Sequence, residues 1–247
     1  MTKPFFIQPT WPASPHIKAL TTTRIGGFSK APFDSLNLGT HVGDQADVVA
    51  RNRQTLISAA HLPSPPLWLQ QVHSTVVVNS ENWQPDISAD AIFSTQRNHV
   101  CAIMTADCLP LLLCDESGTQ VAAAHAGWRG LLNGVIENTV KPFQGPRNKL
   151  LAWLGPAIGA TQFEVGEEVF NAFTESDAKA HTAFIQTDGQ HYLADIYALA
   201  RQRLNALGIE QIYGGDHCTV SEAETFFSYR REGQTGRMAS LIWIASK

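Results

Sequence analysis

The chain has 247 residues, enough for one large domain or two small ones, and 44% of them are hydrophobic and 16% charged. This balance is typical of a globular protein with a full core, and it excludes extended disorder. The formal charge of −4, without long runs of either sign, excludes a general attraction to nucleic acid or membranes, so we expect a small-molecule partner.

No repeat, low-complexity tract or flexible linker divides the chain, so we expect one domain over residues 1–247. In chain order, the patterns predict a short strand at 21–24 and a helix at 44–60. Residues 67–78 indicate two β segments around His73. The strongest β region lies in the middle of the chain, with strands expected at 100–105, 109–113 and 121–125.

One helix is predicted after Gly130, because apolar residues of 131–140 recur on one face. A buried strand at 149–154 ends at Gly155 and Pro156. The remaining expected elements are helices at 166–173 and 195–207 and β segments at 226–229 and 238–244. Strands and helices are interspersed without a regular βαβ order, so the predicted fold class is mixed α/β, or α+β.

Three reactive side chains lie at the ends of predicted elements. Cys108 follows the strand at 100–105, His125 ends the strand at 121–125, and His73 lies in the turn within 67–78. Element ends are where binding residues collect on a rigid support. Two imidazoles and a thiolate leave the fourth position of a zinc ion open, as in catalytic sites. We therefore predict that His73, Cys108 and His125 bind zinc.

The same residues also fit a metal-free Cys–His hydrolase or amidase, with Cys108 as nucleophile and His125 or His73 as its base. Sequence alone does not separate these two hypotheses. A non-catalytic binding module is a third, weaker hypothesis. Cys101 and Cys114 lie inside apolar strands and are expected to be structural.

Other polar residues near these positions are candidates for contacts with the substrate. Arg129 is flanked by glycines at a strand-to-helix junction, where backbone amides can hold an anion. Arg129 and Arg24 are the candidates for bidentate bonds to phosphate, and Asn37 lies in a polar loop expected to bind substrate. Asp107 precedes Cys108 and is expected either to carry protons or orient a ligand, or to be a turn residue.

Cysteine content and the N-terminal sequence predict the compartment. The stretch MTKPFFIQPTWPASP lacks the apolar core of a signal peptide, and no segment approaches the roughly 18 apolar residues of a membrane span. Four cysteines are too few for a disulfide scaffold in a chain of this length. The expected location is therefore the cytoplasm, without a membrane partner, and the oligomeric state is left open.

The segments 71–73, 105–110 and 123–130 resemble the YfiH-like laccase-domain family. Further matches follow in order over nearly the whole chain, at 22–27, 34–39, 153–159 and 226–231. The resemblance implies a single-domain α/β fold of layered sheets flanked by helices, related to cysteine-dependent deamidase toxins. It also implies metal ligands at His73, Cys108 and His125.

The activities implied by this resemblance are phosphorolysis of adenosine, inosine or methylthioadenosine and hydrolytic deamination of adenosine. Some bacterial relatives are linked instead to the correction of peptidoglycan precursors. An older name, multicopper polyphenol oxidase, fits poorly, because no two of the nine histidines are separated by a single residue, as in trinuclear copper clusters. Two histidines and a cysteine also form the equatorial set of blue-copper sites, so copper is the alternative ion.

Overall fold

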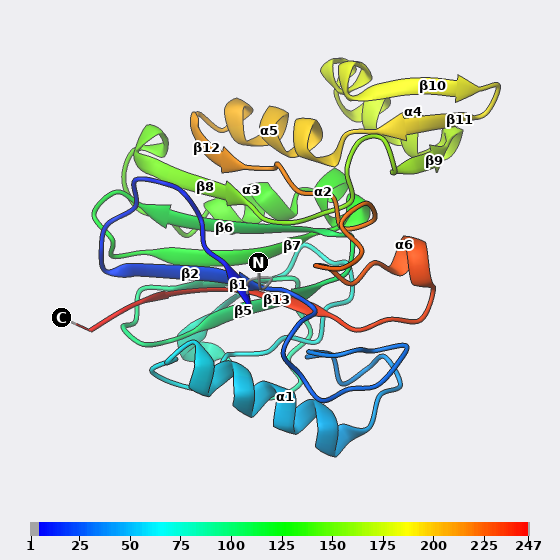
Figure 1. The fold of residues 1–247 in the computed structure, drawn as a ribbon. Coiled ribbons are helices and arrows are strands. Elements are labelled where there is room, and N and C mark those ends of the chain that lie inside the picture. Colours follow the sequence, from blue (N-terminus) through cyan, green and yellow to red (C-terminus); the bar gives the residue numbers. More distant parts are fainter. Residues whose placement is uncertain (1–4, 247) are drawn as a thin grey trace.

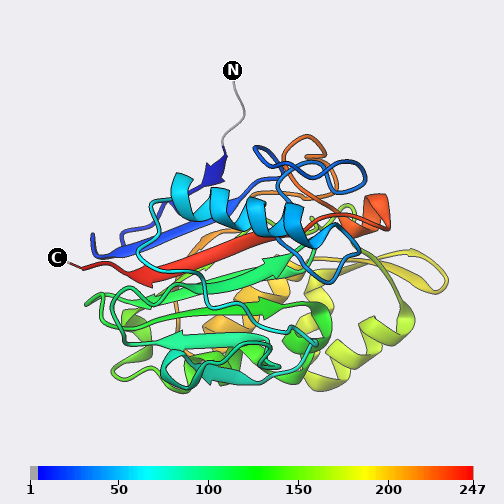
Figure 2. The ribbon, with the colours of Figure 1, turned by 90° about the horizontal axis from the view of Figure 1, so that it is seen from below.

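Two β-sheets packed face to face form the centre of the molecule, which the computed structural model describes over residues 5–246 (Figure 1). The smaller sheet has the strand order β1-β2-β13-β5, and the larger sheet has the order β12-β8-β6-β7-β4-β3. Helix α1 covers the outer face of the smaller sheet, as Figure 2 shows from below. Helices α2, α3 and α5 cover the outer face of the larger sheet. This arrangement confirms the predicted mixed α/β fold of layered sheets flanked by helices.

The bounds of the strands and helices are as follows. The smaller sheet comprises β1 (Phe6–Ile7), β2 (Ile17–Thr22), β13 (Met238–Ile244) and β5 (Cys101–Thr105). The larger sheet comprises β12 (Gln211–Gly214), β8 (Leu150–Leu154), β6 (Leu109–Asp115), β7 (Val121–Ala126), β4 (Ala91–Ser94) and β3 (Val77–Asn79). A third sheet comprises β10 (Phe184–Asp188), β11 (His191–Ala194) and β9 (Glu164–Gly166). The helices are α1 (Ala46–Ala59), α2 (Trp128–Asn133), α3 (Val135–Val140), α4 (Glu167–Ser176), α5 (Ile196–Ala206) and α6 (Tyr229–Glu232).

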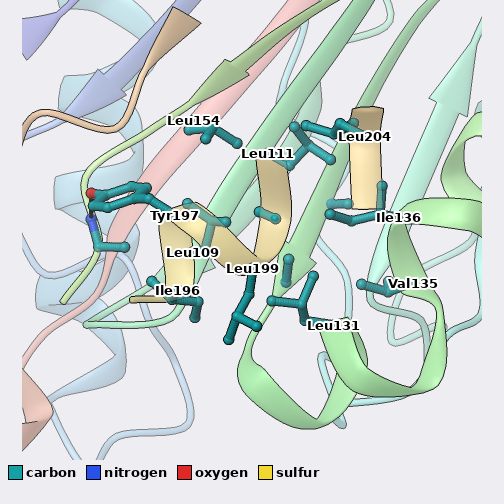
Figure 3. Packing of buried hydrophobic residues seen from close by; sticks show 14 of the residues in the cluster. Leu109, Leu111, Leu131, Val135, Ile136, Leu154, Ile196, Tyr197, Leu199 and Leu204 are labelled. Carbon is teal, nitrogen blue, oxygen red and sulfur yellow. Dashed lines mark hydrogen bonds between the residues drawn. The ribbon is translucent and has the colours of Figure 1, made fainter. Parts of the chain in front are cut away.

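Strand β6 is buried on both faces, which explains its nearly continuous apolar sequence. Successive side chains of a strand point to opposite faces, so Leu112 packs toward the smaller sheet and Leu111 packs toward the helices. Figure 3 shows Leu111 among the side chains of the outer helices, including Leu199 and Leu204 of α5. Each fully buried leucine of this kind contributes about 1.5–3 kcal/mol to folding. The larger sheet is therefore a rigid support for the loops at its ends.

Most of the predicted elements are present. The expected strands at 100–105, 109–113, 121–125, 149–154 and 238–244 are β5, β6, β7, β8 and β13. The expected helices at 44–60, 166–173 and 195–207 are α1, α4 and α5. The strand expected at 21–24 begins earlier, at Ile17, and ends at Thr22.

Three predictions of secondary structure were wrong. The helix expected over 131–140 is two helices, because Gly134 adopts a left-handed conformation with φ of 96° between them. Residues 226–228 form no strand, since Phe226 and Phe227 are buried by packing against Met238, and α6 begins at Tyr229. Only Val77 and Val78 of the segment 67–78 lie in a strand. The rest is a loop that makes isolated bridges at Leu67 and Gln70.

The two main sheets meet at a loop of three residues. Residues 106–108 connect β5 of the smaller sheet to β6 of the larger sheet. Across the larger sheet, Pro110 of β6 pairs with His125 of β7, so the beginning of β6 lies beside the end of β7. None of the helices within residues 5–246 is both long enough and apolar enough to cross a membrane.

Candidate metal centre

The three predicted metal ligands come together at this end of the sheets. Cys108 comes from the loop between β5 and β6, His125 from β7, and His73 from the loop that precedes β3. One potential ligand atom of each residue lies within 4.8 Å of the other two. The Cys108 Sγ atom is 4.0 Å from His73 Nε2. The structure therefore places all three side chains where they can share one ion.

Gly127 leaves open the space next to the three ligands. A β carbon at this position would lie 3.0 Å from Cys108 Sγ, 3.1 Å from His73 Cδ2 and 3.5 Å from His125 Nε2. A side chain here would compete with an ion and its substrate for the same volume. Two imidazole nitrogens and a thiolate are a donor set that zinc and copper both accept. The donors and the space beside them thus fit a metal ion.

Asp90, which the sequence patterns did not single out, holds two of the three ligands. Its fully buried carboxylate lies 2.8 Å from His125 Nδ1. The backbone N–H groups of Val72, His73 and Ser74 donate to the same carboxylate at 3.1, 3.0 and 2.6 Å. His73 has a φ of 59°, and N–H groups converging on an anion stabilise such a left-handed turn. Asp90 therefore fixes both the ring of His125 and the backbone of His73.

Gln71 anchors the same loop to the smaller sheet. Its side-chain amide donates to the Met104 carbonyl at 2.8 Å and accepts from the Met104 N–H at 2.7 Å. This pair of bonds takes the place of a neighbouring strand at the end of β5. The loop that carries His73 is therefore attached to both sheets, through Gln71 to β5 and through Asp90 to the beginning of β4.

Electrostatic interactions favour the charged forms of Asp90, Cys108 and His125. Burial raises the pKa of Asp90, but hydrogen bonds from His125 and Ser74 lower it by a larger amount. The resulting pKa of Asp90 is about 2. Burial opposes a thiolate at Cys108, yet the charge and hydrogen bonds of His125 and His73 hold the pKa of Cys108 below its usual range. Burial likewise opposes a charged His125, yet the Cys108 thiolate and Asp90 raise the pKa of His125. These shifts favour a Cys108 thiolate beside a His125 imidazolium.

Two other cysteines have the opposite environment. Cys101 and Cys114 are fully buried in β5 and β6. Burial raises the pKa of Cys101 to about 12, and burial together with the charge of Asp115 raises the pKa of Cys114. Both thiols therefore stay protonated, as is expected of structural residues.

Asp107 contacts the protein around the site. Its carboxylate accepts hydrogen bonds from Thr219 Oγ1 and from the Arg230 N–H, both at 2.6 Å. Its φ of 86° turns the chain just before Cys108. These contacts favour a positioning role for Asp107, with the side chain holding the segments around 219 and 230 against the Cys108 loop.

The three candidates for phosphate or substrate contacts lie in different environments. Arg24 donates to the carbonyls of Asp34 and Ala223 and pairs with Glu232 at 2.8 Å. Asn37 is fully buried, and both atoms of its amide are hydrogen-bonded within the protein. Arg129 is exposed, stacks 4.3 Å over the Trp128 ring and makes no polar contact with any residue of 5–246. Of the three, Arg129 is the one whose whole guanidinium group lacks a polar partner within residues 5–246.

Comparison with known proteins identifies the family. Residues 18–245 match the family described as multi-copper polyphenol oxidoreductase laccase. The chain belongs to this family. It is 58% identical over 240 residues to purine nucleoside phosphorylase YfiH of Escherichia coli (strain K12), which covers 96% of this chain and 98% of that protein. It is 52% identical over 241 residues to purine nucleoside phosphorylase of Haemophilus influenzae, again over 96% and 98% of the two chains.

Solved structures of the family have the same architecture. Neisseria meningitidis protein NMB0706 matches with a TM-score of 0.95 and 51% identity, over 98% of this chain and 100% of that chain. YlmD from Geobacillus stearothermophilus matches with a TM-score of 0.91 and 28% identity, over 100% and 98% of the two chains. These matches confirm the resemblance to the YfiH-like laccase-domain family.

The family description mentions several copper ions, which need several groups of ligands. Within residues 5–246, histidine, cysteine and acidic side chains form one group of three or more that lie close enough to share an ion. That group is His73, Cys108 and His125. The structure of this family member thus offers a site for a single metal ion.

We expect Asp90→Asn to weaken metal binding about 10- to 100-fold, the usual effect of losing a partner of a metal-bound histidine. An amide would direct an N–H₂ group at backbone donors that now bond to a carboxylate. Competition titration against a chromophoric zinc chelator measures the change. Asp47→Asn, an exposed position at the start of α1, is the matched control. An unchanged zinc affinity would show that the ligands keep their places without the carboxylate.

We also expect Cys108 of the metal-free protein to react with iodoacetamide at pH 7, where an ordinary thiol is only about 3% ionised. The lowered pKa of Cys108 keeps the thiolate populated at that pH. Peptide mapping distinguishes Cys108 from Cys218. Burial raises the pKa of Cys218, but hydrogen bonds from Ser221 and Gly159 lower it by more, so this thiol is also expected to react. Added zinc should protect Cys108. Labelling of Cys108 that begins only above pH 8 would contradict the pairing with His125.

Proposed function

We propose that this protein is a zinc-dependent purine nucleoside phosphorylase. It would cleave adenosine, inosine or methylthioadenosine with phosphate and release the free base and ribose 1-phosphate. The observation that carries the proposal is the three-ligand centre, open beside Gly127. The relative of 58% identity, which is named a purine nucleoside phosphorylase, supports the choice of reaction.

The residues of the site have separable roles in this proposal. His73, Cys108 and His125 hold the ion, which in such sites supplies Lewis acidity at an open position. Asp90 accepts a bond from His125 Nδ1, so that the other ring nitrogen, Nε2, is free to be a ligand. Gly127, which has no side chain, leaves space for the substrate beside the three ligands. Asp107 positions the Cys108 loop through its bonds to the segments around 219 and 230.

The same centre supports hydrolytic deamination of adenosine as an accompanying reaction. Phosphorolysis and deamination differ in the nucleophile, phosphate in the first and water in the second. Deamination needs no phosphate contact, so it depends on the ligands and the nucleoside alone. We therefore propose that both reactions use one site and that phosphate selects between their products.

A second candidate function rests on a specific observation, the row of contacts from a carboxylate through a histidine to a thiol. Asp90, His125 and Cys108 are connected in the order acid, histidine, nucleophile, which is the arrangement of cysteine hydrolases. In this alternative the metal-free protein is an amidase that corrects peptidoglycan precursors. All four cysteines are free thiols, which supports a reducing, cytoplasmic location for either function.

The products distinguish these functions. Purified protein of known metal content, given adenosine and phosphate, should release adenine and ribose 1-phosphate, and chromatography should show no adenine when phosphate is omitted. Inosine should appear when phosphate is omitted. Zinc-loaded protein that forms none of these products would reject the nucleoside enzyme. Amide cleavage that persists after chelation would favour the amidase.

The ligand assignment makes a separate prediction. The parent protein should contain about one zinc ion per chain, as expected of a three-ligand site. His73→Ala, Cys108→Ala and His125→Ala should each lose the metal and phosphorolysis while circular dichroism shows a folded protein. Cys101→Ala, which removes a buried thiol of β5, is the matched control and should keep both properties. Full zinc occupancy in Cys108→Ala would refute the assignment.

A further inference from the structure

A cavity of about 490 Å³ lies next to the loop that carries His73. Gln71 and Val72, the two residues before this ligand, are part of its wall, and so is Met104 of β5. This volume falls within the range of about 300–1,000 Å³ that is typical of small-molecule sites. The cavity therefore borders the loop that carries His73.

Basic side chains gather around this cavity. His41 and Arg53 line it directly, as does the acidic Asp86. Arg53 Nε donates to the Leu38 carbonyl at 3.0 Å, which fixes α1 against the loop that leads to His41. Arg237 packs on the same loop, because a β carbon at Gly39 would lie 2.8 Å from Arg237 Cγ. Two arginines therefore hold this loop immediately before His41.

The strand pairing places Arg237 close to the metal ligands. Met238 of β13 pairs with Thr105, the last residue of β5, so Arg237 continues toward residue 106 and the Cys108 loop. Partial burial lowers the pKa of Arg237, while the charges of Cys108 and Asp107 act in the opposite direction. Partial burial and the charges of Arg237 and Arg53 lower the pKa of His41. The basic cluster thus extends from the cavity toward the Cys108 loop.

Among residues 5–246, neither Arg53 nor Arg237 forms an ion pair, whereas Arg24, Arg203 and Arg231 each pair with a glutamate. The guanidinium groups donate to backbone carbonyls, and Arg53 also approaches the Met104 sulfur and stacks 4.3 Å over Trp68. Burial lowers the pKa of both arginines, and for Arg237 the more distant charges of Cys108 and Asp107 oppose this effect. Arg53 lines the cavity, and Arg237 lies beyond its wall on the side of the Cys108 loop. Arginines without an ion-pair partner beside a cavity are typical of a site for an anion.

We propose that His41, Arg53 and Arg237 form a phosphate-binding subsite of the metal centre. The ligand is a phosphate group, supplied either by free phosphate as co-substrate or by a nucleotide. The assignment of free phosphate rests on the proposed phosphorolysis. Two cationic arginines, with the His41 imidazole as a hydrogen-bond donor beside them, match the two negative charges of phosphate better than Arg129, a single exposed cation stacked on Trp128.

Direct binding of labelled inorganic phosphate, measured by equilibrium dialysis of the purified protein, tests the subsite. His41→Glu and Arg237→Gln should each weaken binding about ten- to hundredfold, because the first adds a carboxylate that repels phosphate and the second removes a charge-assisted bond. His41 is exposed and has no hydrogen bond to other residues of 5–246, so its replacement should leave the fold intact. Arg237→Lys should restore part of the affinity, because it keeps the charge.

The control is Arg51→Gln, an exposed arginine of the same helix as Arg53 that stacks on Phe28, and it should bind phosphate like the parent. Unchanged binding in both His41→Glu and Arg237→Gln would overturn the proposal. A loss confined to Arg129→Gln would also overturn it and would place phosphate at the beginning of α2.

Adenosine 5′-monophosphate separates the two sources of the phosphate group. If free phosphate occupies the subsite, the variants raise the KM for phosphate, and the nucleotide binds no more tightly than adenosine. If a nucleotide occupies it, the nucleotide binds more tightly than adenosine, and His41→Glu removes the difference. Phosphate binding without phosphorolysis would reject the proposed function and retain the subsite. If the parent protein catalyses phosphorolysis and the variants bind phosphate as the parent does, the subsite is rejected and the proposed function is retained.

Discussion

The rest of the site depends on the hydrogen bonds that surround the buried carboxylate of Asp90. A carboxylate removed from water is strongly destabilising unless donors surround it. Here the donors are the ring of His125, the Ser74 hydroxyl and three successive backbone N–H groups of the loop 72–74. Because all of these donors bond to one carboxylate, the loop with His73 is held in a fixed position relative to the strand with His125. The geometry of the ligands is therefore set before any ion binds.

The elements that the sequence predicted well are those whose burial is governed by regular pairing. Strands β6 and β7 are buried on both faces, so their apolar runs are visible without knowledge of the fold. The segments 67–78 and 226–229 are also apolar, but their residues are buried by loop packing, which has no characteristic period. The grouping of His73, Cys108 and His125 was predictable because cysteine and histidine at the ends of strands are chemically conspicuous.

Asp90 and the basic cluster were not predictable, because each depends on contacts between distant segments. Asp90 meets His125 only through the register of β4 with β7, and in the sequence it looks like any acid before an apolar strand. His41, Arg53 and Arg237 come from a loop, a helix and the beginning of the last strand. Conversely, Arg24 and Asn37 stand in polar segments that suggest binding, yet their polar groups bond within the protein. Local sequence does not show whether a polar group has an internal partner.

The position of Cys108 between the two sheets has a consequence for folding. An ion shared by Cys108, His125 and His73 would act as a cross-link between β5, β7 and a loop attached to both sheets, and two of these ligands are 35 residues apart in the chain. A ligand that binds only the native state adds about 2.7 kcal/mol of stability when its concentration is 100 times its dissociation constant. The unfolding temperature would then depend on the concentration of free metal. Removal of the ion by a chelator would therefore weaken the connection between the two sheets and also abolish the activity of the site.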